Sequence, residues 1–83
     1  MAAKFELDEA VFPQPQGNVR GFLIAMVTYS DGKSKRLAHS YLLVDETGSV
    51  SIEMPKKISA ADIAVVTEAF TAFNARLAEL VAQ

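Results

Sequence analysis

The chain has 83 residues, 51% of them hydrophobic and 22% charged, and a formal net charge of -2. Such a length fits one domain, and such a composition excludes a disordered or low-complexity chain. The sequence has no cysteine, which excludes a disulfide scaffold, a thiolate metal site and a catalytic thiol, and its acidic balance gives no general attraction to nucleic acid or to anionic membranes.

The first ten residues, MAAKFELDEA, have no apolar run behind Lys4, and the uncharged apolar run at residues 21–28 is too short to cross a bilayer. We therefore expect a single domain over residues 1–83 that is soluble, unprocessed and cytoplasmic, without membrane contact. A chain of this size hides only about 60% of its unfolded surface, so an oligomeric partner would add to a marginal core.

The first predicted strand lies close to the N-terminus. Phe5 and Leu7 alternate with acidic residues, which is the pattern of a half-buried strand, and we expect this strand to end near Phe12. The segment PQPQGN, residues 13–18, predicts a turn, because two prolines remove hydrogen-bond donors and Gly-Asn favours a reversal of the chain.

Two β-branched and aromatic runs follow, at residues 19–30 and 33–44. The Asp-Gly pair between them, at positions 31–32, is typical of a two-residue hairpin loop in a type I′ turn. A fourth strand at residues 49–54 alternates apolar with polar side chains until Pro55 ends it. Together the strands predict an antiparallel meander in the order 1-2-3-4.

The remaining residues predict one long helix. Ser59 and Asp62 resemble a capping box, with Asp in place of the usual Glu, and Ile58 and Ile63 occupy the positions of a hydrophobic staple. A single apolar stripe follows at alternating steps of three and four, made of Ile63, Val66, Phe70, Phe73, Leu77 and Leu80. A helix over residues 60–82 would be about 34 Å long, whereas four strands span only about 15–20 Å, so we expect it to overhang its own sheet. The predicted fold is α+β: a four-stranded antiparallel β-meander followed by one long C-terminal α-helix packed on one sheet face.

A two-residue loop would fix the register of the central hairpin and therefore the face of each side chain. One face then has three opposing pairs, Met26 with Leu37, Ile24 with His39, and Phe22 with Tyr41. The other face has Val27 opposite Arg36, Val19 opposite Val44, and the small residues Gly21, Ala25, Ala38 and Ser40 near its centre. Because these small residues leave room for Phe70 and Phe73, we expect the helix to cover this second face. Pairing of Asp45 with Ser49 would add Val50, Ile52 and Met54 to the same core.

The first face is then apolar and has no remaining element to cover it. Its predicted partner-binding residues are Phe22, Ile24, Met26, Leu37, His39, Tyr41 and Leu43. The expected charged rim contains Arg20, Lys33, Lys35, Glu6, Asp8 and Glu53. An exposed apolar centre with a mixed charged rim is typical of a protein interface, and two copies of the chain could bury about 800 Å² each there. A register shifted by one residue, or a sheet bent enough to bury both faces, would leave no such surface.

These observations favour a small non-enzymatic interaction protein: a homodimer, an adaptor, an inhibitor, or an immunity or antitoxin-type protein. One alternative is a single-stranded nucleic-acid-binding protein, in which basic residues flank a stacking platform formed by Phe22 and Tyr41. The basic candidates are Arg20, Lys33, Lys35 and Arg36. A four-stranded meander followed by one long helix is also similar to the unit of Whirly-like single-stranded DNA-binding proteins, a likeness of topology and not of sequence motif. A further alternative is a small oligomeric ligand-binding domain or enzyme.

The search for catalytic and metal-binding patterns is negative. His39 is the single histidine, and no Ser/His/Asp or Cys/His arrangement can be placed around it. The acidic pairs lack the spacing of a calcium loop, and the isolated glycines form no phosphate-binding motif. We therefore expect no catalytic residue, no metal ligand and no cofactor.

Overall fold

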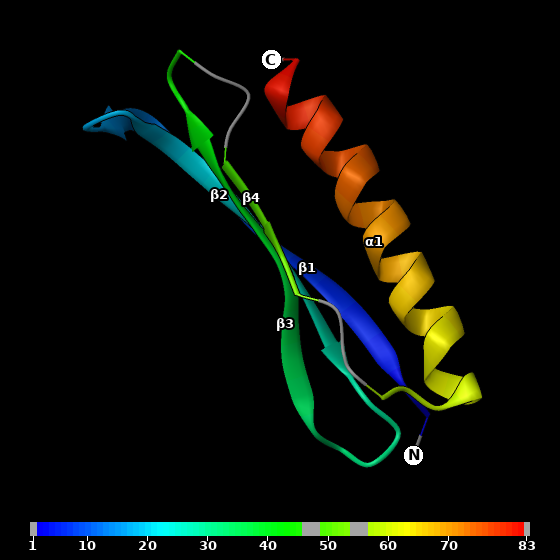
Figure 1. Cartoon of the computed structure of the whole chain (residues 1–83). Coiled ribbons are helices and arrows are strands. Elements are labelled where there is room, and N and C mark those ends of the chain that lie inside the picture. Colours follow the sequence, from blue (N-terminus) through cyan, green and yellow to red (C-terminus); the bar gives the residue numbers. More distant parts are fainter. Residues whose placement is uncertain (1, 46–48, 54–56, 83) are drawn as a thin grey trace.

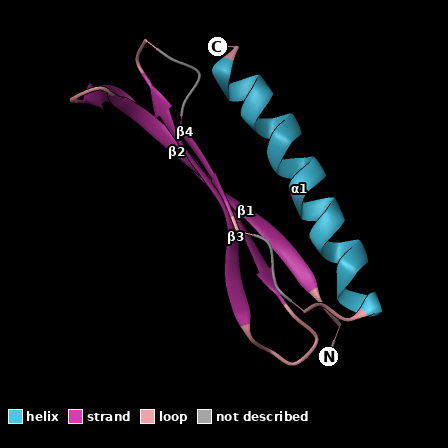
Figure 2. Cartoon of the chain, in the orientation of Figure 1, coloured by secondary structure: helices cyan, strands magenta, loops and turns pink. Residues whose placement is uncertain are grey.

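The computed structural model describes residues 2–45, 49–53 and 57–82 (Figure 1). Its elements, in chain order, are β1 (Lys4–Gln16), β2 (Val19–Thr28), β3 (Ser34–Leu43), β4 (Ser49–Ile52) and α1 (Ala60–Val81). The strands form one antiparallel sheet in the order β1-β2-β3-β4, and the helix packs on one face of it (Figure 2). The predicted fold class, an α+β meander with a C-terminal helix, is confirmed.

The helix lies along β2 and does not cross the sheet. In its first turn the Asp62 carboxylate accepts hydrogen bonds from Ser30, just beyond the end of β2. In its last turn the carbonyl oxygen of Leu80 accepts a hydrogen bond of 2.8 Å from Arg20, at the start of β2. At about 3.3 Å per strand residue and about 1.5 Å per helix residue, the 10 residues of β2 match the 22 residues of α1 in length. The predicted overhang is therefore wrong, and Leu80 and Leu77 belong to the chain's own core.

β1 runs past the predicted break. Instead of ending near Phe12, it shifts register after Val11 and pairs with β2 again at Gln16, opposite Val19. The two prolines in this segment fit because β1 is an edge strand, whose outward positions need no N–H donor. Gly17, with a φ of 64°, then reverses the chain into β2.

The loop between β2 and β3 is one residue longer than predicted. The Tyr29 N–H donates to the carbonyl of Lys33 at 2.7 Å, and the Gly32 N–H donates to the carbonyl of Tyr29 at 2.9 Å. In this loop Gly32 has a positive φ of 88° and Asp31 does not, whereas a type I′ turn requires two positive values. The predicted type I′ turn is therefore wrong; a tight turn followed by a left-handed glycine is the usual three-residue hairpin loop.

A β-bulge at Leu37 offsets the extra loop residue. Met26 pairs with Arg36 and Ala25 pairs with Ala38, so Leu37 lies between two paired residues without a partner of its own. The predicted place of Leu37, opposite Met26 and away from the helix, is wrong because the longer loop puts Arg36 opposite Met26 and turns the next side chain, Leu37, under the helix. It is 1% exposed there.

Beyond the bulge the predicted register returns. Two predicted pairs are confirmed, Ile24 with His39 and Phe22 with Tyr41. Two others are wrong: Val27 lies opposite Lys35 and not Arg36, and Val19 lies opposite Leu43 and not Val44. The first error follows from the longer loop, and the second from an irregularity at Arg20, which has no strand partner in β3.

β4 pairs farther along β3 than predicted. Ser49 lies opposite Tyr41 and not opposite Asp45, a difference of four residues that keeps Val50 and Ile52 on their predicted face. The helix, however, packs on β1, β2 and β3, and Ile52 is 52% exposed beside it. The expectation that β4 completes the core is therefore wrong for the described residues, and Met54 lies outside them.

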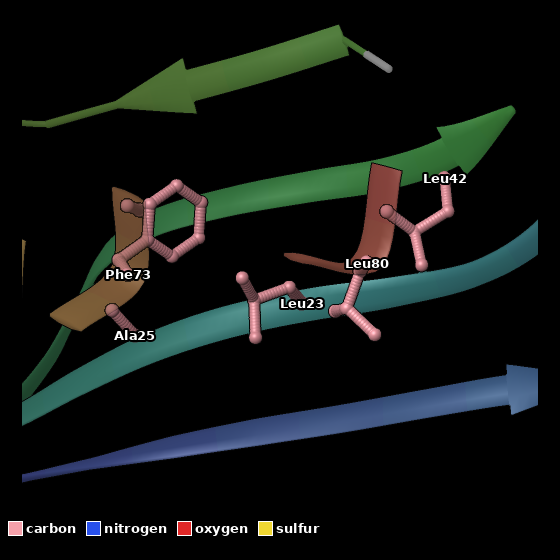
Figure 3. Packing of buried hydrophobic residues seen from close by; sticks show 6 residues of the cluster. Leu23, Ala25, Leu42, Phe73 and Leu80 are labelled. Carbon is pink, nitrogen blue, oxygen red and sulfur yellow. The ribbon is translucent and has the colours of Figure 1, made fainter. Parts of the chain in front are cut away.

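Phe73 is the centre of the core. It is fully buried and packs with Ala25 and Ala38, which confirms the predicted match of a large helix residue with small strand residues (Figure 3). The same cluster contains Leu23, Leu42 and Leu80. A second cluster, nearer the start of the helix, contains Val27, Leu37, Val66 and Ala69. Phe70 packs against both clusters but stays partly exposed, and Ile63 is 48% exposed, so the buried stripe is narrower than predicted.

The helix begins at the predicted cap. Ser59 Oγ accepts a hydrogen bond of 3.3 Å from the Asp62 N–H and donates one of 2.9 Å to Asp62 Oδ2. The Asp62 carboxylate is buried and also accepts hydrogen bonds from the N–H and the hydroxyl of Ser30. The cap therefore fastens the start of α1 to the β2–β3 loop.

We expect Ser59→Ala to lower the free energy of unfolding by about 1 kcal/mol, because it removes a side-chain cap from the first turn. Urea denaturation followed by circular dichroism measures this change. Ser51→Ala, at an exposed position of β4, is the matched control and should leave the midpoint in place. An unchanged midpoint for Ser59→Ala would contradict the capping role.

Phe73→Ala should lower the free energy of unfolding by about 3–5 kcal/mol, because it leaves a cavity over the small strand residues. For a domain this small, such a loss approaches the whole stability. Phe70→Ala should cost clearly less, since that side chain is partly exposed. Equal losses in chemical denaturation of the two variants would show that Phe73 is not the centre of the core.

Candidate functional site

The sheet face turned away from α1 has no described helix or strand over it (Figure 1). Successive strand residues point to opposite faces of a sheet. In β2 every second residue is buried on the helix side, and the residues between them point to this surface. We call this surface the open face. Its residues are Lys4, Glu6, Asp8, Ala10, Phe12, Phe22, Ile24, Met26, Thr28, Ser34, Arg36, His39, Tyr41, Leu43 and Ser51.

Strand pairing arranges most of these side chains in rows across β1, β2 and β3. The first row is Glu6, Met26 and Arg36. The second row is Asp8, Ile24 and His39. The third row is Ala10, Phe22 and Tyr41. These three rows therefore have an apolar residue of β2 at their centre, and the row beyond them, Lys4, Thr28 and Ser34, is polar.

The centre of the open face is apolar and partly aromatic. Phe12 meets Phe22 edge to face, with ring centroids 6.4 Å apart. His39 meets Tyr41 in the same way, with ring centroids 4.4 Å apart. Tyr41 is 48% exposed, whereas the β2 side chains between β1 and β3 are partly buried by their neighbours. A flat apolar surface of this kind is unusual on the outside of a monomer.

The carboxylates and the guanidinium of the three apolar-centred rows lie on different strands. Glu6 and Asp8 lie on β1, where Lys4 precedes them on the same face, and Arg36 lies on β3 with His39 beside it. Two strand spacings of about 4.8 Å separate β1 from β3, so Glu6 and Arg36, at opposite ends of the first row, lie about 10 Å apart. Within the described residues Glu6, Asp8 and Arg36 form no ion pair.

The environment of His39 disfavours its protonated form. Partial burial, and secondly the positive charge of Arg36, lower the pKa of His39 below its usual value of 6.5. This effect of Arg36 agrees with the bulge, which brings both side chains to the same face. In a separate chain near neutral pH, the basic end of the second row is therefore an uncharged imidazole.

The structure brings together six of the predicted partner-binding residues on the open face: Phe22, Ile24, Met26, His39, Tyr41 and Leu43. Leu37 is the exception, since it belongs to the helix-side core. Glu6 and Asp8 lie at the margin of the face, as predicted.

The predicted basic residues do not form one cluster. Arg20 donates to the helix carbonyl of Leu80 on the covered side of the sheet. The Lys35 ammonium lies 2.9 Å from the Glu53 carboxylate, and Lys33 is exposed in the β2–β3 turn. Of the four, Arg36 alone shares the open face with the aromatic residues.

Among the members of the open face, sequence reasoning missed Ala10, Phe12 and Arg36. The alternation that begins at Phe5 and Leu7 continues through residue 12, so it could have placed Ala10 and Phe12 on this face. Arg36 reaches the face because the longer loop shifts the register of β3 by one residue ahead of the bulge, and the sequence offers no local signal for that loop length.

Two hollows on the described surface are small. One, of about 160 Å³, is lined by Lys4, Phe5, Glu6, Met26 and Thr28. The other, of about 70 Å³, is lined by Arg36, Leu37, Ala38, His39, Ser51 and Glu53. Small-molecule sites usually enclose about 300–1,000 Å³, so neither hollow favours a ligand-binding or catalytic pocket.

Two further searches of the described residues are negative. They contain no group of three or more His, Cys, Asp or Glu side chains that could hold a metal ion. They also contain no helix that is both long and apolar enough to span a membrane. Comparison with models of protein families, with curated proteins and with solved structures finds no match to the chain. The open face is therefore interpreted from its own geometry and chemistry.

The His39 pKa offers a test of the environment described for the open face. In dilute solution we expect its imidazole to titrate below 6.5, and Arg36→Gln to raise the midpoint by removing a repulsive charge. The unfolded chain binds this proton more readily, so the contribution of His39 to stability falls as pH drops from 6.5 through the lowered pKa. Proton NMR measures this midpoint without ambiguity of assignment, because the chain has one histidine and the imidazole signals that titrate belong to it. A midpoint above 6.5 would contradict the described environment.

Proposed function

We propose that this protein is a non-enzymatic interaction module that binds a protein chain through the open face. The observation that supports this most strongly is the uncovered apolar surface of β2, flanked by β1 and β3. Apolar side chains at the centre of a protein interface supply most of the binding energy, and charged side chains at its margin supply specificity. The partner is either a second copy of the chain or another protein, which the module would join as an adaptor, inhibitor, immunity protein or antitoxin.

The energetic argument rests on Phe22, Ile24 and Met26. Full burial of an apolar side chain is worth about 1.5–3 kcal/mol relative to full exposure, and these three are still partly exposed in the separate chain. A partner that covers them gains the remaining part of this free energy from three adjacent positions on one strand. Their place between two other strands also restricts their motion, so covering them costs little conformational entropy.

The nucleic-acid alternative has less support. A single-strand binder needs a basic groove beside its stacking aromatics, and here Glu6 and Asp8 share the open face with Phe22 and Tyr41. The two fully charged cations among the residues of the open face, Lys4 and Arg36, lie on different strands, β1 and β3. Titration with a labelled single-stranded oligonucleotide at low salt tests this alternative, and salt-dependent binding lost in Tyr41→Ala would favour it over the protein-binding proposal.

The substitution Ile24→Glu tests the proposal at the centre of the open face. We expect it to abolish association, with a second copy or with another protein, because it places a charge in the desolvated part of the interface. The variant should stay folded, since Ile24 does not belong to the helix-side core. Ile63→Glu is the matched control, because Ile63 is 48% exposed on the helix and lies outside the open face.

Two measurements are needed on the wild type and both variants. Sedimentation equilibrium over a dilution series reports self-association, and affinity capture from a lysate of the native host reports other partners. Circular dichroism on the same samples confirms folding. Association lost in Ile24→Glu but kept in Ile63→Glu supports the proposal. The proposal is wrong if all three chains behave alike, or if Ile24→Glu unfolds the protein.

A further inference from the structure

We infer that the occupant of the open face is a second copy of this chain, stacked face to face about a two-fold axis that runs along β2. This inference rests on the proposed function and specifies its partner. It follows from the order of the side chains along each row of the open face. When a row is turned end for end and laid on itself, its residue of β1 meets a residue of β3 that it fits.

The symmetry argument starts from the strand order. A two-fold axis that lies in the interface and follows β2 turns each row onto the same row of the second copy, with its ends exchanged. β1 of one copy then lies over β3 of the other, and β2 lies over β2. The complementarity of the two surfaces can therefore be read from the ends of each row.

The first row is complementary in charge, and the second row pairs a carboxylate with an imidazole. In the first row Glu6 faces Arg36 of the second copy, and the symmetry repeats this contact once more. In the second row Asp8 faces His39 of the second copy, again twice, where the carboxylate can accept a hydrogen bond from the imidazole. Opposite charges that meet across an interface set its orientation and suppress other arrangements. Within the described residues Glu6, Asp8 and Arg36 form no ion pair in their own chain.

The third row is complementary in size. Ala10 faces Tyr41 of the second copy, so the smallest side chain of the open face meets its largest exposed one. Close packing favours such a match of small with large. At the centre Phe22, Ile24 and Met26 meet their own counterparts, which buries the apolar surface of β2 on its second face.

Other ways of joining two copies fit less well. An axis across the strands at the level of Ile24 would place Asp8 over Asp8, where like charges repel, and would leave neither carboxylate facing an imidazole. Pairing through the sheet edges is also disfavoured, because β4 has four residues and β1 has prolines in its second half. Face-to-face stacking of twisted sheets, with strands crossing at about 30° and sheets about 10 Å apart, meets neither obstacle.

A charge exchange tests this geometry. Glu6→Arg alone places two guanidinium groups against each other across the interface, and Arg36→Glu alone places two carboxylates against each other. Each single variant should weaken self-association roughly tenfold or more. In an equimolar mixture of the two variants, both contacts of the mixed dimer become Arg with Glu, so a heterodimer should form. Glu68→Arg, at an exposed position of the helix, is the matched control and should dimerise like the wild type.

Sedimentation velocity of each chain and of the mixture, with circular dichroism to confirm folding, gives the result. Rescue in the mixture supports the inference, because a folding defect in either chain cannot be repaired by the other. If the wild type dimerises but the mixture does not, the geometry is wrong while binding through the open face stands. If the wild type is monomeric at the highest soluble concentration, the second copy is excluded, and capture by the wild type against Ile24→Glu decides the proposed function separately.

Discussion

The packing of α1 along β2 is the constraint on which the rest of the structure depends. Phe73 lies over Ala25 and Ala38, and these small residues decide which face of the sheet the helix covers. The 22-residue helix lies along the 10-residue strand β2 and packs on β1, β2 and β3. Its length matches that of β2, so none of it extends beyond the sheet to cover another surface. β2 nevertheless has apolar residues on both of its faces, a pattern typical of strands that are buried on both sides. The described elements provide a cover for the first of these faces, and the proposed partner would provide the second.

The bulge at Leu37 connects this core to the open face. With a three-residue loop and no bulge, every later residue of β3 would point to the opposite side of the sheet. His39 and Tyr41 would then lie under the helix, and Ala38 would face away from Phe73. One inserted residue returns Ala38, His39 and Tyr41 to their predicted faces, whereas Leu37 and Arg36 keep the faces that the longer loop gives them, in the core and on the open face. A local irregularity thus controls both the packing of the helix and the charge pattern of the surface.

The sequence predicted those features that depend on local signals, namely the strands, the capped helix and their order. It could not predict the loop length and the bulge, because each changes the register by one residue and neither leaves a periodic pattern. Their effects cancel, so the pairs of Ile24 with His39 and Phe22 with Tyr41 are correct although the loop that predicted them is wrong. The direction of the helix depends on which strand has the space for Phe73, and that is a property of tertiary packing. The extension of β1 through its prolines likewise depends on its edge position, which is known only once the sheet is assembled.

The separation of charge on the open face has two consequences that belong together. In a single chain the acidic side chains of β1 and the cation Arg36 are too far apart to neutralise each other, so they remain hydrated at the margins of an apolar surface. Hydrated charges at such margins oppose unspecific stacking, because any partner that covers them without compensation must desolvate them at a cost. A partner with bases over β1 and acids over β3 avoids that cost. The feature that opposes indiscriminate contact with the apolar strip of β2 would therefore also select the proposed partner and the orientation in which the two meet.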